Sequence, residues 1–239
     1  MENHVTILDW DSDFFGYQIG RINANALNEI RLKGLIEEAK ADGYKLIYLF
    51  TSPSDEIANA AASTVGAKLV DQKVTFRILN PEMTGVNEKE HIADYPSDEP
   101  SPKLIELSLQ SGIYSRYKID KNFKQHEFER LYRAWIENSV NKKIANRSFV
   151  FVEDGEELGV VTAMIKPEGA HIGIIAVDEH ARGKSIGSRL MKHLMFELKD
   201  KGIPLLDVAT QVNNESACNF YKKLGFKEHT LDNIYHIWL

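Results

Sequence analysis

Two basic side chains stand beside small residues in a segment of the second half of the chain. Arg182 and Lys184 flank Gly183, and Ser185 and Gly187 follow. Apolar side chains then recur at every fourth position, which predicts an amphipathic helix. The first N–H groups of a helix have no intrahelical partner, and the helix dipole adds partial positive charge there. The segment therefore predicts a cradle for an anion, and a pyrophosphate is the anion we expect.

The spacing of these small residues differs from two known phosphate motifs. Neither G-x-x-x-x-G-K-[ST] nor G-x-G-x-x-G is present. A short loop of glycine and serine before a helix is also a common tight turn. Phosphate binding by this loop therefore depends on support from residues elsewhere in the chain.

Composition narrows the class of protein. The 239 residues are 43% apolar and 27% charged, with a net charge of −6, as in an ordinary globular protein. No basic run of the kind that follows a nucleic-acid backbone is present, so we expect no nucleic-acid partner. The single cysteine, Cys218, excludes an intramolecular disulfide and a cysteine-cluster metal site, and we expect no metal. No leading signal segment or long apolar run is seen, which predicts a cytoplasmic protein without membrane insertion.

The order of apolar runs predicts an α/β protein in two parts. Residues 1–81 read as strand, strand, helix, strand, helix, strand, which indicates a small α/β domain. Residues 82–102 are acidic, contain proline and have few apolar side chains, and we interpret them as a linker. Residues 103–239 form the second domain. Its strands are expected near 149–153, 158–165, 169–177, 205–211, 227–231 and 235–239, with helices between them.

Two aromatic segments are candidates for contacting a small molecule. Residues 9–16 interleave three aspartates with three aromatic residues, which favours neither a strand nor a helix. They form either a turn that caps the core or a loop that recognises a ring, an amine or hydroxyl groups. Tyr114 and Arg116 lie in a second turn, where they could clamp a substrate or pack between helices.

The second domain resembles the GNAT superfamily of acetyl-CoA-dependent N-acetyltransferases. The resemblance covers roughly residues 115–239 and is carried by Arg182-x-x-Ser185-x-Gly187, by Asn214, by Tyr221 and by Leu224-Gly225-Phe226. Ser185 stands where a glycine is usual in that family. The resemblance implies a GNAT fold, with a mixed central sheet flanked by helices, and acetyl-CoA as the acyl donor.

A narrower resemblance is to the dTDP-4-amino-sugar acetyltransferases of the TDP-fucosamine type. It is carried by the opening D-W-D-S-D-F-F-G, by V-A-T-Q-V-N-N at 208–214 and by Tyr221. In that family an N-terminal α/β part precedes the GNAT domain. The acceptor that the resemblance implies is a nucleotide-linked 4-amino-4,6-dideoxyhexose, a small-molecule amine.

The GNAT resemblance also implies where the donor lies. Two neighbouring strands splay apart in GNAT folds, here Ile174–Val177 and Val208–Gln211, and the pantetheine arm lies between them. Backbone N–H groups near Ala176 and Val177 would face the thioester oxygen. The donor-binding residues expected on this basis are Ile175, Ala176, Val177, Arg182, Gly183, Lys184, Ser185, Ile186, Gly187, Ser188, Asn214, Ala217 and Tyr221.

Two side chains are candidates for moving protons in this reaction. The GNAT resemblance implies that Tyr221 is the general acid. A phenol of reference pKa about 10 is protonated at neutral pH and can donate to a thiolate. The spacing of the neighbouring apolar residues alone predicts a tyrosine packed in the core. His171 is the candidate base, with a reference pKa near 6.5. Strand alternation places it on the face of Ile175 and Val177. A structural histidine and a water chain to the amine remain alternatives.

Several readings of the acceptor remain open. The residues expected to contact a sugar nucleotide are Phe14, Phe15, Tyr114, Arg116 and Gln211. The alternatives are a GNAT enzyme that acts on a protein amine or small polyamine, and an acyl-CoA-binding sensor without catalysis. Residues 235–239 either close the sheet or pair across a homodimer.

Overall fold

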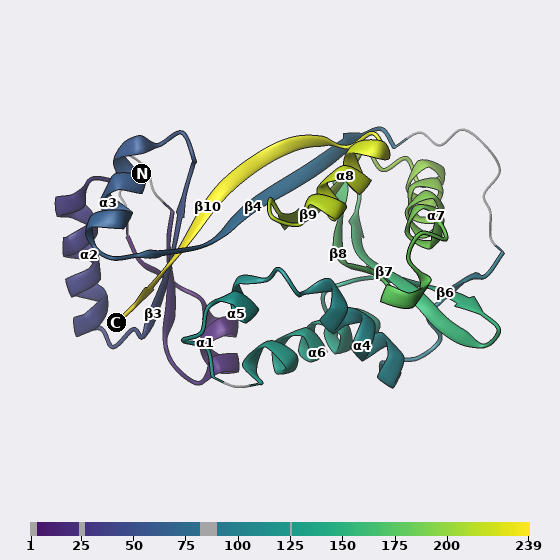
Figure 1. The fold of residues 1–239 in the computed structure, drawn as a ribbon, viewed down its shortest axis with the longest axis horizontal. Coiled ribbons are helices and arrows are strands. Elements are labelled where there is room, and N and C mark those ends of the chain that lie inside the picture. The colour runs from purple at the N-terminus through teal and green to yellow at the C-terminus, as the bar shows by residue number, and fades with distance from the viewer. Residues whose placement is uncertain (1–3, 24–26, 82–89, 125) are drawn as a thin grey trace. The chain divides into compact units, whose positions relative to one another are not determined.

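The computed structural model describes residues 4–23, 27–81, 90–124 and 126–239 (Figure 1). The chain forms two compact units. The first unit comprises residues 1–74, 211–213 and 230–239, and the second comprises residues 75–210 and 214–229. Two long strands, β4 (Lys68–Leu79) and β10 (Lys227–Trp238), contribute residues to both units.

The first unit is a sheet with helices α2 and α3 packed on one face. Strand β1 is antiparallel to β2, β2 is parallel to β3, and β10 is antiparallel to β3. Apolar side chains of β3 and β10, such as Ile47 and Ile237, pack with Leu35 and Ala58 of the two helices. The elements are β1 (Thr6–Ile7), α1 (Asp9–Phe15), β2 (Ile19–Asn23), α2 (Glu29–Ala41), β3 (Leu46–Thr51) and α3 (Glu56–Thr64).

The second unit is a mixed sheet with helices on both faces. Strands β5 to β8 pair antiparallel in chain order, and β9 is parallel to β8. Val160 packs with α4 and α6 on one face, whereas the adjacent Gly159 faces Ile186 and Leu190 of α7 on the other. The elements are β5 (Ile92–Asp94), α4 (Pro102–Ser111), α5 (Arg116–Ile119), α6 (Glu127–Val140), β6 (Arg147–Glu153), β7 (Glu156–Lys166), β8 (Gly169–Val177), the 3-10 turn η1 (Glu179–Ala181), α7 (Ile186–Asp200), β9 (Leu205–Gln211) and α8 (Glu215–Lys223).

The mixed α/β class predicted from the sequence is confirmed, but residues 9–15 form a helix rather than a loop. Trp10 and Phe14, four residues apart, stack with ring centroids 5.2 Å apart. The first turn carries Asp9 and Asp11, which the helix dipole favours, and Gly16 ends the helix with a left-handed φ of 77°. Because aspartates alternate with aromatic residues here, the sequence pattern does not indicate this contact between residues i and i+4.

The expected linker and the end of the chain also differ from prediction. Residues 82–89 lie outside the described residues, but Ile92–Asp94 form a strand that pairs with β6. The two strands expected at the C-terminus are one strand, β10. The polar break between them is accommodated because the Asn233 amide bonds Gln72 and Asn59, both at 3.0 Å. The two compact units divide within β4 and β10. The domain boundary expected at 82–102 stays a prediction.

The same order of elements occurs twice along the chain. Strand, helix, strand, helix, strand describes both β2-α2-β3-α3-β4 and β8-α7-β9-α8-β10. In each series the first two strands are parallel. The second helix of each series is followed by a glycine with positive φ, Gly66 in one and Gly225 in the other. The repetition is structural, since the two segments share few identical residues.

Candidate functional site

Strands β8 and β9 part from each other half-way along their length. Their parallel pairing comprises Ala170 with Leu206, His171 with Asp207 and Ile172 with Val208. No further pair joins these two strands, both of which the structure describes throughout. Beyond Ile172, this edge of β8 no longer pairs with β9. This is the splay that the family resemblance implies.

A β-bulge lies at the point where the strands part. Thr162 of β7 pairs with Ile174 and Ala163 pairs with Ile172, which leaves Gly173 as an extra residue in β8. The Ile174 N–H donates to the hydroxyl oxygen of Thr162 at 3.0 Å, and the Thr162 side chain is fully buried. A bulge bends its strand and increases the local twist. Thr162, which the sequence did not single out, thus fixes the bend of β8.

The bulge changes the face on which His171 lies. His171 pairs with Met164, and Ile174 pairs with Thr162, two residues on one face of β7. His171 therefore shares a face with Ile174. Strand alternation alone predicts the face of Ile175 instead. That prediction is wrong because the extra residue in β8 shifts the alternation by one. The side chain of His171 is exposed.

The first turn of α7 offers its N–H groups without a side-chain cap. Ser185 precedes the helix in the left-handed region, with φ 63° and ψ 10°, and its side chain makes no capping hydrogen bond. No acidic residue lies in the first turn, and Arg182 and Lys184 are exposed. This combination is suited to an anion. The left-handed φ also explains why glycine is usual at the position of Ser185.

The start of α7 lies against β8 and α8. A methyl group added to Gly187 would lie 3.4 Å from both Val177 and Phe220. The end of the splayed strand, the uncapped helix start and α8 are therefore within van der Waals reach of one another. These are three of the elements on which donor-binding residues were predicted.

Asn214 and Ala217 begin α8 as the sequence predicted. The Asn214 side chain accepts a hydrogen bond from the Ala217 N–H at 3.2 Å and donates to the Thr210 hydroxyl at 3.4 Å. Its carbonyl oxygen thus caps the helix. A contact between this side chain and the donor stays a prediction.

Tyr221 is buried in an aromatic cluster. It is 3% exposed, and its ring centroid lies 5.4 to 5.9 Å from those of Phe76, Phe220 and Phe226. Burial raises the pKa of the Tyr221 phenol well above its ordinary value. The hydroxyl is therefore protonated at neutral pH and can act as a donor.

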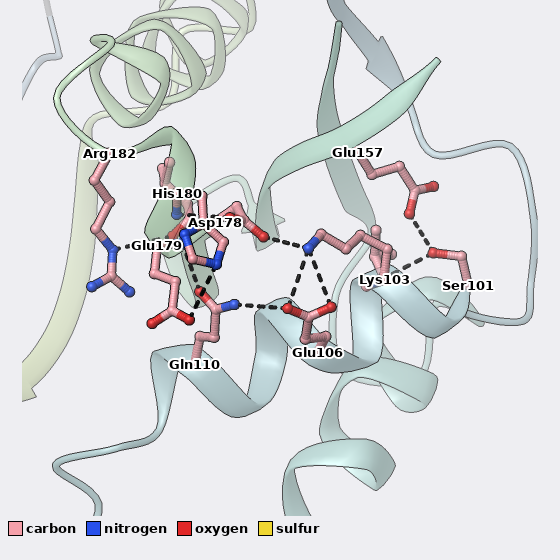
Figure 2. A network of polar contacts seen from close by, with 11 residues as sticks. Ser101, Lys103, Glu106, Gln110, Glu157, Asp178, Glu179, His180 and Arg182 are labelled. Atoms are coloured by element: carbon pink, nitrogen blue, oxygen red, sulfur yellow. Dashed lines mark hydrogen bonds and ion pairs between the residues drawn. The ribbon is translucent and has the colours of Figure 1, made fainter. Parts of the chain in front are cut away.

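A polar network joins α4 to the segment between β8 and α7 (Figure 2). The Lys103 ammonium forms an ion pair with the buried carboxylate of Asp178 and a second one with Glu106, at 3.1 Å. Gln110 donates to Glu106 at 3.0 Å and accepts from the Glu179 N–H at 3.0 Å. The hydrogen bond from Lys103 lowers the pKa of Asp178. No local sequence pattern predicts this network, because Lys103 and Asp178 are 75 residues apart.

The residues expected to contact the acceptor belong to different units. Phe14, Phe15 and Gln211 lie in the first unit, and Tyr114 and Arg116 lie in the second. Phe15 is 6% exposed. The Arg116 guanidinium lies over the ring of Tyr117, 4.5 Å from its centroid, and donates to its hydroxyl at 2.7 Å. The role of these residues in acceptor binding stays a prediction.

Within the described ranges, no group of three or more His, Cys, Asp or Glu side chains could hold a metal ion. Among the helices that the structure describes, none is both long enough and apolar enough to span a membrane.

Comparison with known families assigns the splayed strands and the helix start to a known domain. Residues 110–226 match the Acetyltransferase (GNAT) family. The chain contains a GNAT acetyltransferase domain. The matched residues run from the end of α4 to the glycine and phenylalanine that follow α8, so they include the splayed strands, the bulge and α7.

Relatives of known name match parts of this chain at low identity. The spore coat polysaccharide biosynthesis protein SpsD of Bacillus subtilis is 24% identical over 143 residues, which are 60% of this chain and 49% of SpsD. The ribosomal protein bS18 alanine N-acetyltransferase of Escherichia coli K12 is 26% identical over 104 residues, 43% of this chain and 70% of that enzyme. The match thus spans about half the length of SpsD.

Solved structures share the fold across both units. A conserved protein of unknown function from Staphylococcus epidermidis has a TM-score of 0.70 at 11% identity, covering 99% of this chain and 91% of the other. A tandem GNAT protein from the clavulanic acid biosynthesis pathway has a TM-score of 0.57 at 15% identity, covering 92% and 75%. At these identities the likeness concerns the fold alone.

Proposed function

We propose that this protein transfers the acetyl group of acetyl-CoA to a primary amine. The observation that carries the proposal is the separation of β8 and β9 beyond Ile172, next to an α7 whose first turn has no side-chain cap. An extended thioester arm requires an unpaired strand edge, and a diphosphate requires free N–H groups with nearby positive charge. The GNAT domain has both.

In this proposal the donor is held mainly by backbone groups. The pantetheine arm lies along Ile175, Ala176 and Val177, and those N–H groups of this segment that point away from β7 face the thioester oxygen and stabilise the oxyanion that forms during attack. The diphosphate lies at the start of α7. The residues that hold it are Arg182, Gly183, Lys184, Ser185, Ile186, Gly187 and Ser188. The N-terminal part of α8, with Asn214 and Ala217, borders the arm.

Proton transfer is assigned to Tyr221 and His171. Tyr221 donates its hydrogen bond to the sulfur as negative charge develops on the leaving thiolate. Its apolar surroundings keep the phenol protonated until that point. His171 lies at the last but one β8–β9 pair, just before the strands part, where it can accept a proton from the attacking amine. A water chain would serve the same purpose.

For the acceptor we propose the 4-amino group of a dTDP-4-amino-4,6-dideoxyhexose. Support comes from the similarity to SpsD, whose name places it in spore coat polysaccharide biosynthesis. It also comes from the aromatic and acidic residues of α1, with Trp10 stacked on Phe14 and 45% exposed. In the second unit, the residues proposed to contact the acceptor are Tyr114 and Arg116.

A protein amine is the second candidate acceptor. The specific support is the similarity to the bS18 alanine N-acetyltransferase, which is covered over 70% of its length. That enzyme is named for an acceptor on a protein. The two candidates differ in what they require of the first unit, because a peptide N-terminus offers no nucleobase for its aromatic residues.

The donor half of the proposal is tested by calorimetry and crystallography. We expect heat of binding with coenzyme A, and a crystal soaked with acetyl-CoA should show the diphosphate at the first turn of α7. A diphosphate located elsewhere, or no binding at millimolar ligand, contradicts the proposal.

The acceptor half is tested by a panel of amines with acetyl-CoA, with release of free thiol as the readout. The panel contains TDP-4-amino sugars, peptides with N-terminal alanine, and small polyamines. We expect the highest kcat/KM for a TDP-amino sugar. A preference for the peptide would select the second candidate. Donor binding without transfer to any amine would indicate an acyl-CoA sensor.

A further inference from the structure

Helix α4 presents one polar face to the segment that leads into α7. Lys103, Glu106 and Gln110 are spaced i, i+3 and i+7, so they lie along one side of the helix. All three take part in the network of Figure 2. Ser101 anchors the start of the same helix, because its hydroxyl oxygen accepts from the Leu104 N–H at 3.0 Å and its hydroxyl donates to Glu157 of β7. Helix α4 is thus fixed to the sheet at one end.

The segment between β8 and α7 is held at its start, where the Asp178 N–H donates to the Leu158 carbonyl at 3.0 Å and Ala181 is buried. Asp178 accepts from the His180 N–H at 2.8 Å, which shapes the turn η1. After it, Gly183 and Ser185 both have positive φ, and residues 182–185 are exposed. The bonds that attach the start of this segment to α4 are the ion pair of Lys103 with Asp178 and the bond of Gln110 to the Glu179 N–H.

We propose that Lys103 and Asp178 are positioning residues for the donor diphosphate. The pair fixes the start of the segment that carries Arg182 to Ser185, and so fixes the direction of the free N–H groups at α7. The proposal rests on the proposed function, since the diphosphate is its ligand. Lys103 itself touches no donor atom and acts through Asp178.

The geometry of the pair distinguishes it from an ordinary surface ion pair. The Asp178 side chain is 4% exposed and the Lys103 side chain is 34% exposed. A buried carboxylate is stable only while it is paired and hydrogen-bonded, so Asp178 holds its position as long as both Lys103 and the His180 N–H are present. By contrast, Lys33 and Glu29 on α2 are 58% and 45% exposed and form a solvated pair.

The test measures binding and turnover separately in Lys103→Met. We expect the Kd for coenzyme A and the KM for acetyl-CoA to rise at least about tenfold, because small displacements of positioning groups are costly. At saturating acetyl-CoA, kcat should stay within about twofold of the unaltered protein, because the reacting groups are untouched. Lys33→Met, which removes the same charge from an exposed pair, should leave both constants unchanged.

A double variant separates positioning from simple charge. Lys103→Met leaves the Asp178 carboxylate unpaired, and its charge would repel a diphosphate. Lys103→Met with Asp178→Asn removes that charge, and the asparagine can still cap η1. If position matters, the double variant stays weak in donor binding, whereas Lys103→Arg, which keeps the link, recovers most of the affinity. Circular dichroism and thermal denaturation establish that each variant is folded.

The outcomes are distinct. Recovery of full affinity by the double variant, or an unchanged Kd in folded Lys103→Met, overturns the positioning role while the proposed function stands. If the unaltered protein binds no coenzyme A, both the proposed function and the positioning role fail. A fall in kcat without a change in KM also overturns the proposal.

Discussion

At the scale of single residues, Tyr221 has the chemistry of an acid in the surroundings of a core residue. Its ring packs with Phe76, Phe220 and Phe226, as the spacing of apolar neighbours alone would suggest. Burial raises the pKa of its phenol, which removes any role as a base at neutral pH. The phenol can therefore act only as a hydrogen-bond donor to the negative charge that develops on the leaving sulfur, and the loss of this donor can be measured.

Tyr221→Phe removes the hydroxyl and keeps the packing. We expect kcat to fall at least about tenfold, in the range found for loss of a general acid, with the Kd for acetyl-CoA unchanged. The matched control is Tyr235→Phe, which removes the hydroxyl of another buried tyrosine, here bonded to Asn59 at 3.0 Å in the first unit. An unaltered kcat in Tyr221→Phe would return Tyr221 to a purely structural role.

Ser185 is a second residue whose backbone matters more than its side chain. Its φ of 63° is strained for a side chain with a Cβ, and more so for a β-branched one. Ser185→Gly relieves this strain but raises the conformational entropy of the unfolded chain. The two contributions to the free energy of unfolding are similar in size and opposite in sign, so it should change by less than about 1 kcal/mol.

Ser185→Val tests the same position in the opposite direction. We expect it to lower the free energy of unfolding by about 1–2 kcal/mol and to weaken donor binding, whereas Ser185→Gly should bind coenzyme A at least as well as the unaltered protein. Urea unfolding and calorimetry measure the two quantities. Equal behaviour of the glycine and valine variants would show that the backbone conformation of this residue is not fixed.

At the scale of elements, the bulge in β8 decides what the sheet can bind. The Ile174 N–H is satisfied by a side chain, Thr162, instead of by the neighbouring backbone. The parallel pairing of β8 with β9 ends at Ile172, two residues earlier. The sequence could not reveal this, because Gly173 is compatible with a regular strand and Thr162 reads as one more β-branched residue. The face of His171 was predicted wrongly for the same reason.

Thr162→Val removes the hydroxyl that holds the bulge and keeps the shape of the side chain. A buried N–H is left without its partner, which costs about 1–3 kcal/mol of stability. We also expect kcat/KM for acetyl-CoA to fall, because the bend of β8 is no longer fixed.

The control for this variant is Thr51→Val in the first unit. Thr51 is equally buried and donates to Asn59 at 2.6 Å. Thr51→Val should lower the free energy of unfolding by a similar amount without loss of donor affinity. If both variants have the same effect on donor affinity, the bulge has no special role.

At the scale of the whole molecule, local patterns predicted most elements but not how the units divide. Apolar periodicity located the main helices and strands, since each is long enough to show its period. The pairing of β10 with β3 joins residues far apart in the sequence, and no local pattern records it. For the site, the family motif predicted the start of α7 and α8, whereas Lys103, Asp178 and Thr162 act through contacts between distant segments.

The repeated order of elements raises the question of how many donors one chain binds. In its described residues the first unit lacks the two features on which the donor site of the second unit is proposed. All five residues of β2 pair with β3, so these strands do not part. The Asn28 side chain caps α2 by accepting from the Arg31 N–H at 2.9 Å, and Glu29 places negative charge in the first turn.

We therefore expect one acetyl-CoA per chain, bound by the second unit. Four residues before the glycine that follows the helix, α8 carries Tyr221 and α3 carries Ala62, so the first unit has no phenol at the position that corresponds to Tyr221. Calorimetric titration with coenzyme A should give a stoichiometry near one. Arg182→Glu with Lys184→Glu should abolish that binding, since it places negative charge at the uncapped turn of α7. A stoichiometry of two, or binding that survives the double substitution, would locate a donor in the first unit.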